Sequence, residues 1–191
     1  MGKEFELKYR CDEAALAAVE EAFGPFTPIA METTYYDTPD LKLAFHHWTL
    51  RRRMENGVSV CTFKSPAEDG SRNEWEVNCG SIMQGIMLLC RNGAPWELMR
   101  ATAGGVLPFC GARFTRLAKT IRLENCTLEL ALDKGILTGG NKELPFAELE
   151  VELKDGSREA AIAFAQTLAA QYHLEPEPKA KVVRARELAF L

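Results

Sequence analysis

The sequence Glu-Leu-Glu-Val-Glu at residues 148–152 decides the fold, together with Glu-Phe-Glu-Leu-Lys at residues 4–8. In both stretches charged residues alternate with apolar ones. Successive side chains of a β-strand point to opposite faces, so this period of two predicts strands with one ionic and one apolar face. Glutamates at alternate positions lie roughly 6–7 Å apart and repel one another. Such a face therefore needs cations from neighbouring strands or divalent metals.

Strand patterns recur along the chain and predict a large sheet of about eight mostly antiparallel strands. Asn56-Gly57 is a strong hairpin signal between two of them. Arg51 and Arg53 share one face of the strand before this turn, and the opposite parity places Arg52 on the other face. The strand-like ranges are 1–10, 31–38, 47–54, 58–64, 72–78, 112–123, 126–133, 147–154 and 180–190.

Helical segments separate these strands. Asp12 is a candidate N-cap for an Ala-rich helix that ends near Phe23. Residues 81–104 are typical of two helices divided near Gly93, and a further helix is expected from Ser157 to about Tyr172. Helices interspersed with a mostly antiparallel sheet indicate the α+β class.

Composition excludes several functional classes. The 191 residues are 47% hydrophobic and 26% charged, which predicts a globular chain of one domain. The formal net charge of −4 argues against a general nucleic-acid binder. No apolar run approaches the ~20 residues of a membrane span, and the first residues do not resemble a signal peptide. We therefore expect a cytoplasmic protein with no membrane or nucleic-acid partner.

The cysteines and histidines of the sequence do not form a recognisable catalytic or zinc-binding motif. The six cysteines include no Cys-x-x-Cys pair, so a zinc site is not expected. The three histidines, His46, His47 and His173, do not suggest a nucleophilic relay. Carboxylates without His or Cys select hard cations such as Mg²⁺ or Mn²⁺, whereas clustered Arg and Lys select phosphate. The charged strand faces together predict a metal–polyphosphate site, and closure of the sheet would direct them all into one tunnel.

The ordered motifs of this chain resemble those of the CYTH superfamily, the triphosphate tunnel metalloenzymes. The resemblance begins with the ExExK motif of residues 4–8 and continues through Tyr36-Asp37-Thr38 and Leu50-Arg51-Arg52-Arg53 to the Glu150-Val151-Glu152 and Lys181-Val182-Val183-Arg184 segments. It covers essentially the whole chain. It implies a single CYTH-like triphosphate tunnel domain over residues 1–191, built as an eight-stranded antiparallel β-barrel with helices packed on the outside.

The resemblance also implies roles for individual residues. Mg²⁺ or Mn²⁺ would be held by Glu4, Glu6, Glu74, Glu76, Asp133, Glu150 and Glu152. The triphosphate would be held by Lys8, Arg51, Arg53, Lys64, Arg116, Lys181 and Arg184. The catalytic set would be Glu4, Glu6, Lys8, Glu150 and Glu152. Glu148 extends the acidic run by one position and is expected to be structural.

The family resemblance implies a divalent-metal-dependent hydrolase of small-molecule triphosphates, acting by in-line attack of water on the terminal phosphate. Inorganic tripolyphosphate is the first choice of substrate, because no extra binding module is evident. Alternatives are a thiamine or nucleoside triphosphatase, a class IV-type adenylyl cyclase and a noncatalytic polyphosphate-binding module. A noncatalytic module should have lost part of the acidic set, which is present here. The sequence leaves the physiological substrate and the oligomeric state open.

Overall fold

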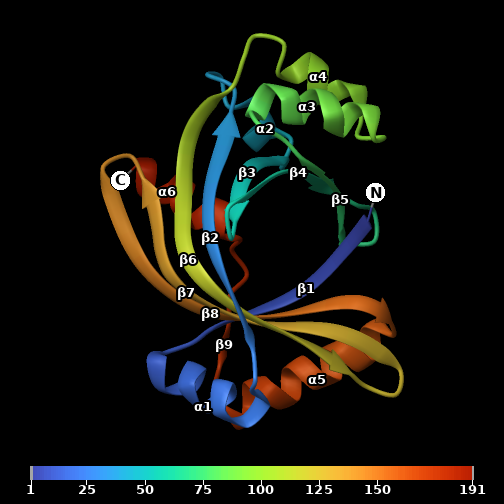
Figure 1. Ribbon diagram of the computed structural model, residues 1–191, viewed down its shortest axis with the longest axis vertical. Coiled ribbons are helices and arrows are strands. Elements are labelled where there is room, and N and C mark those ends of the chain that lie inside the picture. Colours follow the sequence, from blue (N-terminus) through green and yellow to red (C-terminus); the bar gives the residue numbers. More distant parts are fainter. Residues whose placement is uncertain (1, 191) are drawn as a thin grey trace.

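Eight strands close into an antiparallel barrel in the computed structural model, which describes residues 2–190 (Figure 1). The strand order is β5-β4-β3-β2-β6-β7-β8-β1, and pairing of β1 with β5 completes the ring. A short strand β9 (Glu175–Pro176) adds to β1. The barrel strands are β1 (Gly2–Arg10), β2 (Thr27–Asp37), β3 (Thr49–Glu55), β4 (Val58–Pro66), β5 (Arg72–Asn78), β6 (Leu107–Arg122), β7 (Cys126–Gly139) and β8 (Lys142–Gly156). The predicted fold class and barrel are thus confirmed.

Helices cover the strands from different sides. Helices α1 and α5 lie beneath β1, β7 and β8 in Figure 1, and α3 and α4 lie at the opposite end beside β4 and β5. None of the helices within residues 2–190 combines the length and the apolar character needed to cross a membrane. The helices are α1 (Glu13–Phe23), α2 (Lys42–Phe45), α3 (Ile82–Arg91), α4 (Trp96–Ala101), α5 (Arg158–Gln171) and α6 (Lys181–Phe190).

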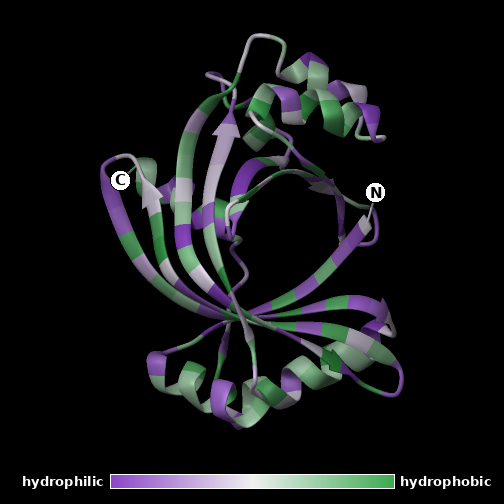
Figure 2. Ribbon diagram, viewed as in Figure 1, coloured by the Kyte–Doolittle hydropathy of each residue, from purple (hydrophilic) through white to green (hydrophobic). Residues whose placement is uncertain are grey.

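The apolar faces of the strands pack against the helices. Leu149 and Val151, which alternate with the glutamates of β8, are buried in the core beneath α1 and α5 together with Leu168. Phe63 and Ile86 belong to a second core, between β3–β5 and the helices α3 and α4. Figure 2 shows the resulting alternation of hydrophilic and hydrophobic residues along the strands. Because the apolar faces are used by the helices, the ionic faces of β1, β3, β5 and β8 are left for the barrel interior.

Capping and turn residues in the sequence correctly predicted where several helices and strands begin or end. The Asp12 carboxylate accepts a hydrogen bond from the Ala15 amide at 2.7 Å and caps α1. Ser157 caps α5 in the same way. Asn56 and Gly57 both have positive φ, at 47° and 88°, as a two-residue type I′ hairpin between β3 and β4 requires.

The prediction of a strand over residues 180–190 is wrong, because this segment forms helix α6. Its buried residues, Lys181, Val182 and Ala185, have helical spacing. The segment is also rich in good helix formers, and α6 packs Val182 and Ala185 against the β6–β8 region of the barrel. A run this short fits either period, and tertiary packing decides between them.

Several predicted strands were too short; β6, for example, begins at Leu107 and not at the expected residue 112. Strands β7 and β8 continue past the expected ends at 133 and 147 and meet in a hairpin at Gly140, which has a positive φ of 58°. The glycines and Pro145 in this stretch are typical of a loop and obscure the continuing strands. Strand β2 begins at Thr27, before the expected start at 31, and includes Pro28. Pro28 is tolerated because the pairing of β2 with β3 begins only at Met31, so one side of Pro28 has no strand partner.

Candidate functional site

A cavity of about 290 Å³ occupies the barrel interior, and most of the residues singled out from the sequence line it. Those that line it are Glu4, Glu6, Lys8, Arg51, Arg53, Lys64, Glu74, Glu76, Arg116, Glu150, Glu152 and Lys181. Asp133 and Arg184 are not among the lining residues. The alternation seen in the sequence therefore brings side chains from β1, β3, β4, β5, β6 and β8 to one internal space.

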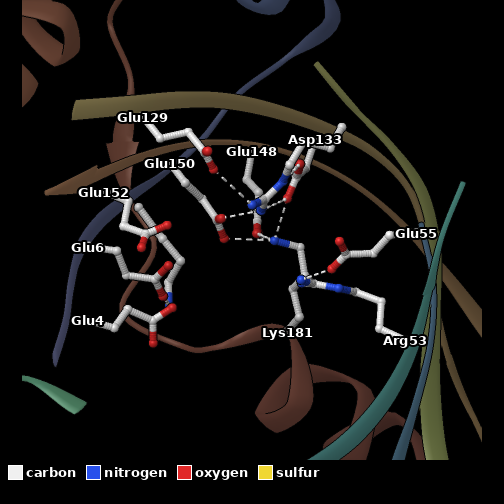
Figure 3. A network of polar contacts seen from close by, with 12 residues as sticks. Glu4, Glu6, Arg53, Glu55, Glu129, Asp133, Glu148, Glu150, Glu152 and Lys181 are labelled. Carbon is white, nitrogen blue, oxygen red and sulfur yellow. Dashed lines mark hydrogen bonds and ion pairs between the residues drawn. The ribbon is translucent and has the colours of Figure 1, made fainter. Parts of the chain in front are cut away.

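One wall of the cavity is acidic. Glu6 on β1 lies opposite Glu152 on β8, which in turn lies opposite Glu129 on β7. In Figure 3 the side chains of Glu4, Glu6 and Glu152 gather on one side of the cavity. Burial raises the pKa of Glu152, and the neighbouring carboxylates of Glu4 and Glu129 raise it further, although the Lys154 ammonium 2.8 Å away opposes this. This group of oxygen donors fits a hard divalent cation.

A basic wall is formed by β3, β4 and β5. Arg51 and Arg53 occupy alternate positions of β3, and Arg72 opens β5. The Nε atoms of these three arginines are buried and have no hydrogen-bond partner within residues 2–190. Arg51 is only loosely paired, with a nitrogen 3.8 Å from both Glu74 and Glu76. Buried guanidinium donors left unused in this way suit an anionic ligand.

Arg52 follows the predicted parity and does not line the cavity. Its Nε donates a hydrogen bond to the Ser59 hydroxyl at 2.8 Å. The residue therefore provides a control that is one position away from Arg51 and Arg53 but on the opposite face of the same strand.

A buried ion network lies beside the acidic wall, centred on Lys181 of α6 (Figure 3). The Lys181 ammonium contacts Glu148, Asp133 at 2.7 Å and Glu150 at 2.8 Å. Burial alone would lower the pKa of Lys181, but these carboxylates outweigh it and raise the pKa. Arg116 forms a bidentate salt bridge with Asp133, in which Nε and Nη2 donate to the two carboxylate oxygens at 2.8 and 2.7 Å. It also contacts Glu150. These carboxylates therefore favour the charged forms of Lys181 and Arg116 although both side chains are largely buried.

This network accounts for the positions of Asp133 and Arg184. Asp133 is fully buried, and its carboxylate is bound by Arg116 and Lys181. Arg184 contacts Glu148 and approaches Glu177 at 3.7 Å. Asp133, Glu148 and Glu150 each bring one oxygen within 4.8 Å of the others, a spacing that a single cation could bridge. In this structure the basic side chains already supply positive charge there.

Several cavity residues were not selected from the sequence, among them Glu129, Arg72, Lys154 and Tyr35. Glu129 and Arg72 share strand faces with selected residues, so the parity that found Asp133 and Glu74 could also have found them. Lys154 follows Glu152 by two positions and lines the same wall. Tyr35 had no distinguishing pattern, because an aromatic side chain on a strand is usually part of the core, and it is indeed only 5% exposed.

The family model described as the CYTH domain matches residues 2–185. The chain belongs to the CYTH family. A curated relative, the inorganic triphosphatase of Haemophilus influenzae, is 25% identical over 175 residues, which are 88% of this chain and 50% of the relative. This CYTH chain thus spans about half the length of the curated relative it matches.

Solved structures share the CYTH barrel. A Hippeastrum protein, described as a candidate adenylyl cyclase with a dominant triphosphatase activity, superposes with a TM-score of 0.66 at 19% identity, covering 97% of this chain and 96% of the other. A candidate adenylate cyclase from Bacillus halodurans gives a TM-score of 0.62 at 18% identity, covering 94% and 96%. At these identities the likeness concerns the fold.

Proposed function

We propose that this CYTH protein is a divalent-metal-dependent triphosphatase whose preferred substrate is inorganic tripolyphosphate. The observation that carries the proposal is the pairing of an acidic and a basic surface in one cavity of the barrel interior. The carboxylates of Glu4, Glu6 and Glu152 can hold a hard cation. Arg51 and Arg53, whose buried Nε atoms have no hydrogen-bond partner within residues 2–190, can bind phosphate oxygens. In a metal–polyphosphate complex the cation would complement the acidic wall and the phosphates would complement the basic wall.

Mg²⁺ or Mn²⁺ would be held by the acidic wall, chiefly by Glu4, Glu6, Glu150 and Glu152. When bound, the ion would neutralise phosphate charge and lower the pKa of the attacking water. Glu74 and Glu76 are further carboxylates of the cavity and stay candidates for a metal. Asp133 would act more indirectly, since it orients Arg116 from within the buried network.

The basic residues would position the substrate and stabilise the transition state. Arg51, Arg53 and Lys64 would bind the non-bridging oxygens, while Arg116 and Lys181 approach the cavity from the buried network. Water attacks the terminal phosphorus, and the bond to the bridging oxygen breaks on the opposite side, releasing orthophosphate and pyrophosphate. Positioning and electrostatic stabilisation supply most of the catalysis in such reactions.

The size of the cavity and the curated relative support an inorganic substrate. About 290 Å³ is at the lower limit of the ~300–1,000 Å³ usual for sites that enclose drug-sized ligands. A cavity at this limit favours the smallest triphosphate, the inorganic chain, over one that carries a nucleoside. The H. influenzae relative is named an inorganic triphosphatase. Product analysis tests the choice: orthophosphate indicates hydrolysis, cyclic AMP from ATP indicates a cyclase, and neither product indicates a binding module.

Removing divalent metal is expected to abolish tripolyphosphate hydrolysis, because no metal then neutralises the phosphate charge or lowers the pKa of the attacking water. Orthophosphate release should fall to background in EDTA and return when excess Mg²⁺ or Mn²⁺ is added. Calcium added to the same concentration serves as a control for simple charge screening. Hydrolysis that persists in EDTA would exclude the metal from the reaction.

Arg51→Ala and Arg53→Ala are each expected to reduce kcat/KM for tripolyphosphate by about 10- to 100-fold, the usual range for loss of a charge-assisted contact. Arg52→Ala is the matched control and should stay within about twofold of the wild type, since Arg52 faces Ser59 outside the cavity. Steady-state kinetics with orthophosphate detection measures all three. Equal losses in the Arg52 and Arg51 variants would remove β3 from the substrate site.

A further inference from the structure

Arg72 differs from every other basic residue of the cavity in its charge balance. Each of the other lysines and arginines lining the cavity has at least one carboxylate partner: Lys8, Arg51, Arg53, Lys64, Arg116, Lys154 and Lys181. None of the carboxylates in the described part of the chain forms an ion pair with Arg72. Arg72 is thus the one basic residue lining the cavity that has no ion-pair partner within residues 2–190, and the carboxylates of Glu4, Glu6 and Glu74 act on it only over longer distances.

The Arg72 side chain is held in place although it lacks an ion-pair partner. One of its terminal nitrogens donates hydrogen bonds to the His47 carbonyl and the Thr49 hydroxyl, both at 3.2 Å. Its Nε is buried and without a partner. A fixed, partly desolvated guanidinium with an unused hydrogen-bond donor is preorganised to bind an anion.

The position of Arg72 extends the basic wall along β3. Thr49, Arg51 and Arg53 occupy alternate positions on the inner face of this strand, so neighbouring side chains originate about 7 Å apart. Arg72 is bound to Thr49 and so lies at the end of the row opposite Arg53. A linear anion lying along β3 would meet Arg53, Arg51 and Arg72 in turn.

We infer that Arg72 is a further substrate-binding residue, which holds the phosphate group of a linear triphosphate at the end of the chain away from Arg53. This inference rests on the proposed function for the identity of the ligand. It assigns to Arg72 a contact with non-bridging oxygens of that phosphate and no part in proton transfer.

The test compares Arg72→Gln with Arg52→Gln, a second arginine without a carboxylate partner that lies outside the cavity. Calorimetric titration with tripolyphosphate in the presence of Ca²⁺ measures affinity independently of turnover. We expect Arg72→Gln to bind tripolyphosphate about 10- to 100-fold more weakly and Arg52→Gln to bind as the wild type does. Arg72→Met, which keeps the apolar stem, takes the place of the glutamine variant if that variant does not fold.

Thermal melting separates ligand binding from a structural role. Removing a buried charge that lacks a counter-ion should leave the melting temperature of the ligand-free protein unchanged or raise it, while the shift caused by tripolyphosphate becomes smaller. A lower melting temperature without ligand, together with wild-type affinity, would make Arg72 a structural residue and overturn the inference.

The outcomes also distinguish this inference from the proposed function. If the wild type binds tripolyphosphate without hydrolysing it, the proposed activity fails, while Arg72 is still judged by the loss of affinity. If the wild type hydrolyses tripolyphosphate and Arg72→Gln binds it equally well, only the role of Arg72 fails.

Discussion

Glu6→Gln and Glu152→Gln are expected to lose at least about 100-fold in kcat for tripolyphosphate while keeping the native fold. Each change replaces a carboxylate of the acidic wall by a neutral amide of nearly the same shape. The metal then loses a charged ligand, and stabilisation of transition-state charge by a bound metal contributes several kcal/mol in such enzymes. Circular dichroism and steady-state kinetics at saturating Mg²⁺ measure the two properties separately.

Glu143→Gln is the matched control for this pair. Glu143 lies on the same strand as Glu152, but it is exposed and pairs with Arg113 at 2.9 Å on the outside of the barrel. Its variant should keep activity within about twofold of the wild type. Because burial and neighbouring carboxylates raise the pKa of Glu152, its neutral amide should not destabilise the ligand-free protein. Near-normal turnover in both acidic-wall variants would place metal binding elsewhere.

The strand faces could be predicted from the sequence because alternation is a local property. Glu4, Glu6 and Lys8 have one parity, and once the strand pairs with its neighbours this parity fixes which way they point. The hairpin at Asn56-Gly57 was predictable for the same reason. Its backbone requirement is satisfied by the two residues themselves, whatever the rest of the chain does.

The charge balance inside the barrel could not be predicted, because it depends on contacts between distant residues. The ion partners of Glu148 come from α6, more than 30 residues away, and α6 itself has a pattern that fits either a strand or a helix. The family resemblance assigned Asp133 and Arg184 to the site. Only the packing of α6 shows that both are used in the buried network. The missing counter-ion of Arg72 is likewise visible only when every neighbouring strand is in place.

Lys181→Met is expected to lower the free energy of unfolding by about 3–5 kcal/mol, the usual cost of removing one partner from a buried ion pair. Lys181 is the cation shared by Asp133, Glu148 and Glu150, and these three carboxylates are buried. Arg116 and Arg184 cannot neutralise all of them, so the variant leaves carboxylate charge uncompensated in a water-excluded position. Denaturation by urea at neutral pH measures the loss.

A double-mutant cycle with Glu148→Gln tests whether this loss comes from the network itself. Removing the Glu148 charge from the Lys181→Met protein relieves part of the excess negative charge. The double variant should therefore be more stable than the sum of the single changes predicts, by about 0.5–3 kcal/mol. Strict additivity would mean that Lys181 and Glu148 are not coupled. In that case the loss would come from the cation–π contacts of the Lys181 ammonium with Phe114 on β6 and Phe146 on β8, whose ring centroids lie 5.2 and 5.4 Å from it.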